Sequence, residues 1–245
     1  MSIQIYRLGL NDPFPPPAQA LADPNGLLAY GGDLSVERLL SAYQQGIFPW
    51  FSAGEPVLWW SPDPRGVLFL DNYRISRSFN KFLKNSSFQV TINNAFVDVI
   101  HACSSVPRQD KGTWITEEMV VAYCKLHEAG HAHSVEVWQE NTLVGGLYGV
   151  AVGRVFCGES MFHLRSNASK LAFHTLVQYL TAQGCTFLDC QMQTQHLSSV
   201  GAEEISRAKF LALLTEEQNR PLAKDAWRPQ NLSHVVQTGR IVLTE

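Results

Sequence analysis

Apolar residues recur along this chain at two different spacings, and these spacings divide it into helices and strands. Spacings of three and four residues predict helices, and these fall at about 36–45, 95–103, 117–128, 167–183 and 207–214. Alternating or short apolar runs predict strands, at 89–92, 134–138, 143–150, 154–162 and 187–192. Ser35 and Ser206 are expected to cap the first and last of the helices, and Gly46 to end the first.

Three of the strands are expected to form a meander, in which 134–138 and 143–150 make a hairpin and 154–162 pairs as the third strand. Residues two apart in a strand point the same way. Cys157, Glu159 and Met161 are therefore expected to share one strand face, and Asp189 and Gln191 another. A polar strand face is either an edge in contact with water or a site held on a rigid sheet. Gly158 favours a site, because a strand glycine often marks a bulge or a close approach.

The N-terminal quarter is rich in aromatic residues and prolines at 47–51 and 58–62, a pattern too irregular for a helix. Large aromatic side chains of this kind either fill a core or line a pocket. The composition shifts near residue 63, which predicts a small N-terminal domain at 1–63 and a larger domain at 64–245. The chain after 214 contains scattered prolines and is expected to be a mostly irregular tail.

Residues 74–84 carry four basic residues and no acid. If this segment is one helix, the spacing of 3, 4 and 3 places Arg74, Arg77, Lys81 and Lys84 in one stripe. Such a stripe is either a solvated face or a phosphate-binding surface.

Composition excludes several classes of protein. With 45% hydrophobic and 17% charged residues, the 245-residue chain is that of a folded protein, and its net charge of −3 attracts no nucleic acid overall. The five cysteines are odd in number and contain no Cys-x-x-Cys pair, which argues against a disulfide framework and for a reducing compartment. No signal peptide and no apolar run of about 18 residues is apparent, so the expected location is the cytoplasm, without membrane contact.

Several motifs point to chemistry that their context does not support. His127-Glu-Ala-Gly-His131 matches a zinc-protease signature, but Gly130 is expected to end the helix between the histidines. The glycines at 145–149 lack the Lys-Ser or Lys-Thr of a phosphate loop. Ser160 is not in a Gly-x-Ser-x-Gly elbow. Cys157 is more easily explained as an inert buried thiol than as a nucleophile.

The sequence resembles the bacterial leucyl/phenylalanyl-tRNA–protein transferases from about residue 14 to 210. The shared motifs, in chain order, are Pro24–Asp33, Tyr43–Phe51, Trp59–Arg65, Gly112–Ile115, His131–Trp138, Phe156–Phe162 and Asp189–Gln191. The resemblance implies transfer of Leu or Phe, and Met weakly, from aminoacyl-tRNA to the α-amino group of proteins that begin with Arg or Lys. The product carries an N-terminal signal for degradation. The implied fold is α+β, with a small N-terminal domain and a larger GNAT-like domain, like the GCN5-related acetyltransferases, whose mixed sheet is flanked by helices.

The implied chemistry is aminolysis of an activated ester, which needs no metal and no cofactor because the tRNA 3′ end carries the activated group. By motif position, the resemblance assigns catalysis to Glu159, Asp189 and Gln191. Gln191 would accept a hydrogen bond from the attacking amine while Asp189 orients it, and Glu159 would hold Gln191 or attract the basic acceptor. An amide is a poor base, so a tRNA 2′-hydroxyl remains an alternative proton carrier.

The resemblance also implies an apolar pocket for the aminoacyl side chain and the terminal adenine. Its residues by motif position are Tyr43, Trp50, Trp114, Leu147 and Met161. The basic residues Arg74, Arg77, Lys81 and Lys84 would hold tRNA phosphates. The protein is expected to act as a monomer. Two alternatives remain: a related acyltransferase with another donor, and a non-catalytic module that recognises basic N-termini through Glu159.

Overall fold

The computed structural model describes residues 5–105, 114–234 and 242–244. Gly112 and Thr113 of the shared motifs, and most of the loop expected before Trp114, lie outside these residues. The N-terminal part forms a four-stranded sheet in the order β1-β2-β4-β3. Its elements are β1 (Tyr6–Leu8), η1 (Pro17–Gln19), β2 (Leu27–Gly31), α1 (Val36–Gln44), β3 (Phe48–Pro49) and β4 (Leu58–Trp60).

The rest of the chain is built on an eight-stranded sheet in the order β12-β5-β11-β10-β9-β8-β7-β13. The strands are β5 (Arg65–Phe69), β7 (Gln89–Ile92), β8 (Ala132–Gln139), β9 (Thr142–Val152), β10 (Val155–His163), β11 (Phe187–Gln191), β12 (Glu203–Ile205) and β13 (Gln230–Asn231). Only β10 and β11 pair in parallel, and the other neighbours are antiparallel. The predicted meander, now β8-β9-β10, is confirmed, as is a mixed sheet in an α+β fold.

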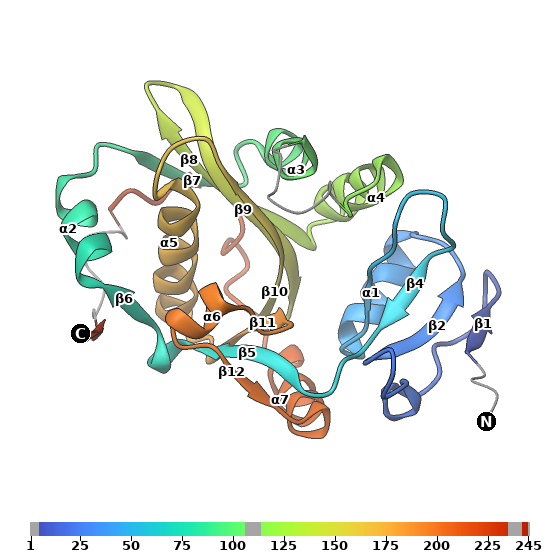
Figure 1. The fold of residues 1–245 in the computed structure, drawn as a ribbon. Helices are drawn as coiled ribbons and strands as arrows, with labels where there is room; N and C mark the ends of the chain where they lie inside the picture. The colour runs from blue at the N-terminus through green and yellow to red at the C-terminus, as the bar shows by residue number, and fades with distance from the viewer. Residues whose placement is uncertain (1–4, 106–113, 235–241, 245) are drawn as a thin grey trace.

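Helices cover both faces of this sheet (Figure 1). One core cluster joins a sheet face to α5 (Ala168–Ala182) and α2 (Arg77–Asn85). The other joins the opposite face to α3 (Phe96–Ser105), α4 (Glu117–Glu128), α7 (Arg207–Gln218) and α1. The helices α1, α4 and α7 each begin at an N-cap hydroxyl: the side chains of Ser35, Thr116 and Ser206 accept the backbone N–H three residues on.

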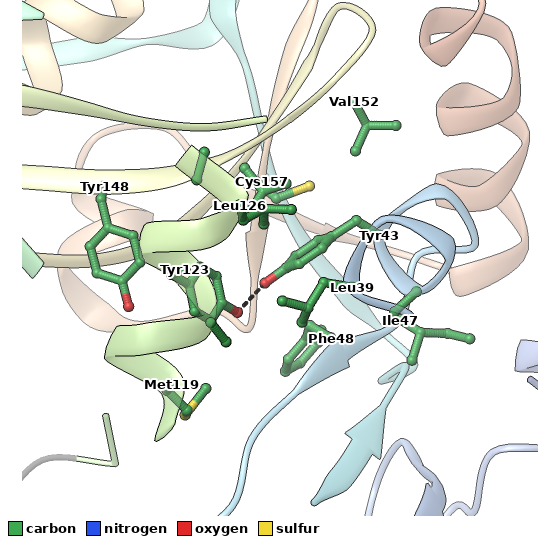
Figure 2. Packing of buried hydrophobic residues seen from close by; sticks show 14 of the residues in the cluster. Leu39, Tyr43, Ile47, Phe48, Met119, Tyr123, Leu126, Tyr148, Val152 and Cys157 are labelled. Carbon is green, nitrogen blue, oxygen red and sulfur yellow. Dashed lines mark hydrogen bonds between the residues drawn. The ribbon is translucent and has the colours of Figure 1, made fainter. Parts of the chain in front are cut away.

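The N-terminal sheet is attached to the larger one by a continuous apolar core. Tyr43, Ile47 and Phe48 belong to one cluster of buried residues with Tyr123 of α4 and Val152 of β9, and Figure 2 shows Tyr43 beside Tyr123. The aromatic residues at 47–51 and 58–62 include both kinds expected from the sequence, those that fill the core and those that line a pocket. Trp59 is fully buried and donates from its indole nitrogen to the Gly31 carbonyl at 2.8 Å, whereas Trp50 is 39% exposed.

The prediction of one helix over 74–84 is wrong. Arg74–Ser76 is the strand β6, and α2 begins at Arg77, with the Ser76 hydroxyl accepting from the Phe79 N–H. β6 pairs in parallel with β14 (Val242–Thr244), so a partner 168 residues away in sequence selects its extended conformation. No local spacing reveals such a partner.

The tail after 214 is more ordered than predicted. α7 continues to Gln218, β13 pairs with β7 at the sheet edge, and β14 pairs with β6. The short strands β5 and β12 and the helix α6 (Gln195–Ser199) were also not predicted. Within the described residues, no helix is both long and apolar enough to cross a bilayer.

Candidate active site

The parallel strands β10 and β11 stop pairing at the point where the predicted catalytic residues lie. Their ladder ends at the pair Cys157–Asp189. Past it, β10 is irregular between Gly158 and Ser160, and β11 between Asp189 and Gln191. A bulge turns a side chain away from the regular alternation, so Glu159 and Gln191 are directed into the space between the parting strands.

The bulge in β10 makes the prediction of one shared strand face wrong. Cys157 pairs with Val150 and Met161 pairs with Leu147, three residues apart on β9. Cys157 belongs to the core beneath α4, whereas Met161 packs against the core on the α5 side. Gly158 was the sequence feature that indicated a bulge or a close approach here, and the bulge is present.

Glu159 and Gln191 contact each other directly. The Gln191 side-chain Nε2 donates to Glu159 Oε1 at 2.8 Å. A carboxylate oxygen can only accept a hydrogen bond, so the amide group of Gln191 must direct its nitrogen toward Glu159. Its oxygen is then available to accept a hydrogen bond from a substrate. Gln191 has φ of 62°, in the left-handed region, and its backbone N–H donates to Asp189 Oδ1 at 2.9 Å. Asp189 therefore holds the unusual backbone conformation that directs Gln191 toward Glu159.

Asp189 itself is fully buried in an ion pair with Arg65 of β5. The guanidinium donates Nε to Oδ1 at 2.8 Å and Nη2 to Oδ2 at 2.7 Å. Arg65 also donates to the Gly46 carbonyl at 3.1 Å and stacks over the rings of Phe48 and Phe210. The structure thus places Asp189 behind Gln191, as a residue that orients the amide.

Glu159 is surrounded by groups that act on its charge in opposite directions. Burial raises the pKa of its carboxyl to about 7, and Asp189 acts in the same sense. Hydrogen bonds from Tyr43, Tyr123 and Gln191 lower it. The Tyr123 hydroxyl donates to Glu159 Oε2 at 3.2 Å. A carboxyl group that titrates near neutral pH is suited to binding or moving a proton.

A cavity of about 460 Å³ opens at Glu159 and Gln191. Its wall is mostly apolar and comes from the eight-stranded sheet, α5 and α6, together with residues 48–50 and Trp114. Four of the five predicted pocket residues line it, namely Trp50, Trp114, Leu147 and Met161. Tyr43 does not line it: this residue is 1% exposed and lies behind the wall, bonded to the Tyr123 hydroxyl. Its predicted pocket position is corrected accordingly.

The sequence interpretation missed several residues of the site. Phe156, Phe173 and Leu176 line the apolar wall. Phe173 and Leu176 are indistinguishable in the sequence from ordinary core positions, and Phe156 lies in a shared motif but was not assigned to the pocket. Arg65 lies within a shared motif, but only tertiary structure reveals its partner. Tyr123 lies within the predicted helix 117–128, and no local signal marks its hydroxyl as a donor to Glu159.

The four predicted tRNA-binding cations are all exposed. Arg77, Lys81 and Lys84 lie on α2, while Arg74 precedes them on β6, so they do not form one helical stripe. None of the four forms an ion pair with any described residue. α2 packs on α5 through Phe79 and His174, whose ring centroids are 5.9 Å apart. The neighbouring Phe173 lines the cavity, so the cationic surface and the cavity flank the same helix.

The competing motifs lack the geometry they require. α4 ends at Glu128, so His127 and His131 are not one turn apart on a continuous helix, and His127 stacks on Phe96. Among the described residues there is no cluster of three metal-ligating side chains. Cys157 is buried, and burial raises the pKa of its thiol well above the usual value.

Two family models match the chain. The model for leucyl/phenylalanyl-tRNA protein transferase matches residues 67–215, and that for the N-terminal domain of the same transferase matches 32–63. The chain belongs to the leucyl/phenylalanyl-tRNA–protein transferase family. The resemblance drawn from the sequence motifs is therefore confirmed, as is the predicted enzyme class, an aminoacyltransferase.

Individual members of the family match over almost the whole chain. The leucyl/phenylalanyl-tRNA–protein transferase of Pseudoalteromonas atlantica is 57% identical over 94% of this chain and 99% of its own length. Those of Chromobacterium violaceum and Yersinia enterocolitica are each 54% identical over 90% of this chain, and over 94% and 92% of their own. Their names describe the transfer predicted from the sequence, of Leu or Phe from aminoacyl-tRNA to a protein.

Among solved structures, L-PGS from Bacillus licheniformis is similar at 15% identity and a TM-score of 0.36, over 73% of this chain and 59% of that one. A similarity this weak supports no fold assignment. The GNAT-like assignment and the domain boundary at residue 63 remain predictions.

The buried ion pair predicts a large loss of stability when one partner is neutralised. In Asp189→Asn, Arg65 keeps its charge at about 1% exposure without a counter-charge. We expect the free energy of unfolding, from urea titration, to fall by about 3–5 kcal/mol. The control is Glu216→Gln, which breaks an exposed pair with Arg220 and is expected to cost less than about 1 kcal/mol. Equal losses in the two variants would contradict this reading of the pair.

The raised pKa of Glu159 predicts a pH-dependent cost to stability. Between the ordinary carboxyl pKa of 4.5 and about 7, the folded protein keeps this proton and the unfolded chain releases it. Stability from Glu159 therefore falls as pH rises through this window and is constant above it. Glu159→Gln should remove that fall, so its melting temperature should rise relative to wild type between pH 5 and pH 8. The exposed substitution Glu140→Gln serves as control, and parallel curves for all three proteins would show that the pKa is not raised.

Proposed function

We propose that this protein transfers Leu or Phe, and Met more weakly, from aminoacyl-tRNA to the α-amino group of proteins that begin with Arg or Lys. The product carries an N-terminal residue that marks it for degradation. The observation that carries the proposal is a mostly apolar cavity, in a member of this family, that is lined by the hydrogen-bonded pair Glu159–Gln191. Intact aminoacyl-tRNA is the only activated donor this reaction requires.

The reaction forms one bond and breaks one. The acceptor amine nitrogen bonds to the aminoacyl carbonyl carbon, and the bond from that carbon to the tRNA 3′-oxygen breaks. The amine loses a proton and the departing oxygen gains one. The free oxygen of the Gln191 amide accepts from the amine and orients its lone pair, while Asp189 holds Gln191 in place. An amide is a poor base, so the 2′-hydroxyl of the terminal tRNA ribose is the better candidate to carry the proton from the amine to the departing oxygen.

The apolar wall of the cavity would take the aminoacyl side chain. Leu147 and Met161 are cross-strand partners on β9 and β10, and Phe156 and Leu176 add to the same wall. Trp50 and Trp114 offer flat ring faces for the terminal adenine. Pockets of this kind select by shape, so Ile and Val, which branch at Cβ, are expected to be disfavoured by about 1–3 kcal/mol.

Arg74, Arg77, Lys81 and Lys84 would hold tRNA phosphates. They are exposed, and no acid among the described residues pairs with them. Phosphate contacts carry no base sequence, which suits an enzyme that accepts tRNAs for more than one amino acid. This local surface lets a protein of net charge −3 bind RNA.

The acceptor requires a negative group near the attacking amine, and Glu159 is that group when ionised. A monomer is the proposed state of the enzyme. The cytoplasm is the proposed location, since the donor is aminoacyl-tRNA.

The decisive experiment is a transfer assay with Phe-tRNA labelled in the amino acid. Two peptides that differ only in their first residue, Arg or Ala, are offered without added metal or coenzyme A. Label is expected in the Arg peptide alone, because only this acceptor combines a free amine with a basic side chain. Labelling of both peptides would overturn the acceptor selectivity, and labelling of neither would overturn the donor or the acceptor class.

In the same assay, Gln191→Ala should lower the rate by about 10²-fold or more, the usual range for groups that orient a proton transfer. The thermal stability of the variant shows whether its fold is retained. A folded variant with wild-type activity would exclude Gln191 from the mechanism.

The cationic surface predicts a steep dependence on salt. If four phosphates are contacted, affinity for aminoacyl-tRNA should fall about 10²-fold between 50 and 200 mM salt. Charge reversal in Arg77→Glu with Lys81→Glu should raise KM for the tRNA and make the slope shallower by about 2, with a small effect on kcat. The control is the equal charge change Lys125→Glu with Lys224→Glu at two other exposed sites. An equal rise of KM in both double variants would attribute the effect to net charge alone.

A further inference from the structure

A chain of buried hydroxyl groups connects the N-terminal domain to Glu159. Tyr43 of α1 and Tyr123 of α4 are 1% and 0% exposed. Their hydroxyls are hydrogen-bonded to each other across the junction between the two parts of the chain (Figure 2). The Tyr123 hydroxyl then reaches Glu159.

The direction of this chain follows from its last member. An ionised carboxylate only accepts, so Tyr123 donates to Glu159 Oε2, and its own oxygen is left to accept from Tyr43. Burial and the neighbouring Glu159 raise the pKa of both phenols well above the usual value, so both keep their protons. Tyr123 thus donates to Oε2 of Glu159 and Gln191 to Oε1, and Tyr43 also lies close enough to Glu159 to lower the pKa of its carboxyl.

We propose that Tyr43 and Tyr123 are positioning residues of the transfer reaction, whose donor chain holds Glu159 as the ionised acceptor that orients Gln191. This inference rests on the proposed function. An ionised Glu159 keeps the Gln191 Nε2 as donor and turns the amide oxygen toward the incoming amine. A protonated Glu159 would present a hydroxyl, which donates and pairs with the amide oxygen instead. The amine would then lose its acceptor.

The inference also assigns a task to the N-terminal domain. Tyr43 is supplied by α1, whereas Tyr123, Glu159 and Gln191 belong to the larger part of the chain. The chain of hydrogen-bond donors is therefore complete only when α1 is packed in this position against the larger part of the chain. Hydrogen bonds within a buried network reinforce one another, so loss of the outer donor weakens the inner bond.

Other groups face Glu159 and act together with the tyrosines. Asp189 raises its pKa from β11. Arg65 on β5 and Cys157 on the same strand as Glu159 also interact with its charge, and Tyr148 of β9 packs its ring on Tyr123. A Tyr→Phe substitution leaves all of these groups in place, so it tests the loss of the hydroxyl donor alone.

The first test compares pH profiles of transfer to the Arg peptide. Tyr123→Phe removes the donor and should move the acid limb of kcat to higher pH. For a shift of one pKa unit, activity at pH 6 falls about tenfold more than at pH 8.5. Tyr43→Phe should move it in the same direction by less. Tyr179→Phe is the matched control, because its buried hydroxyl bonds to the Ala226 carbonyl on another element. A uniform loss of rate, with the limb in its wild-type place, would overturn the proposal.

A second measurement does not depend on activity. Without the Tyr123 donor, folded Glu159 keeps its proton to a higher pH, so stability should fall over a wider window than in wild type. The pH dependence of the melting temperature should therefore be steeper above pH 7 in Tyr123→Phe. The same substitution in a Glu159→Gln background should produce no such change. If wild type transfers nothing, the proposed function fails while this result still decides the role of the tyrosines; a change that persists in the Glu159→Gln background would overturn it.

Discussion

The buried ion pair between Arg65 and Asp189 is the interaction on which the rest of the site depends. Its two short hydrogen bonds join β5 to β11, and the same guanidinium reaches Gly46 and the rings of Phe48 and Phe210. One charged group thus binds the N-terminal sheet, the central sheet and α7 together. A pair with so little exposure is tolerable only because almost every donor and acceptor around it is satisfied.

The ion pair also positions Gln191, whose amide is the proposed acceptor for the attacking amine. Asp189 accepts from the Gln191 N–H while both its oxygens bind Arg65. This bond supports a backbone at φ of 62°, a conformation that non-glycine residues seldom adopt and that needs support from its surroundings. The site therefore has an ordered hierarchy: the buried charge pair holds the backbone, and the backbone aims the side chain.

The chemistry of the cavity follows from placing a few polar groups in an apolar setting. Burial makes ionisation of Glu159 costly, and the hydrogen bonds from Tyr123 and Gln191 offset part of that cost. The balance brings its titration close to neutral pH. The apolar wall also strengthens the electrostatic interactions among the polar groups of the cavity.

The sequence alone determined most of the secondary structure, the meander and the family. These depend on local spacing, N-cap residues such as Ser35 and Ser206, and motifs that are contiguous in the chain. It also brought Glu159 and Gln191 forward as candidates. Predictions from the sequence were wrong where tertiary contacts determine the local conformation. Arg74–Ser76 is a strand because it pairs with β14, and a bulge in β10 places Met161 on a different face from Cys157.

Only the tertiary structure decided what these candidates do. Asp189 is separated from Arg65 by 124 residues and Tyr43 from Tyr123 by 80, so no local pattern records that they meet. Side-chain hydrogen bonds are directional, and their partners are set by how sheets and helices pack. That packing places Tyr43 behind the cavity wall, where its hydroxyl bonds to that of Tyr123, and it places Asp189 where its carboxylate accepts from the Gln191 N–H.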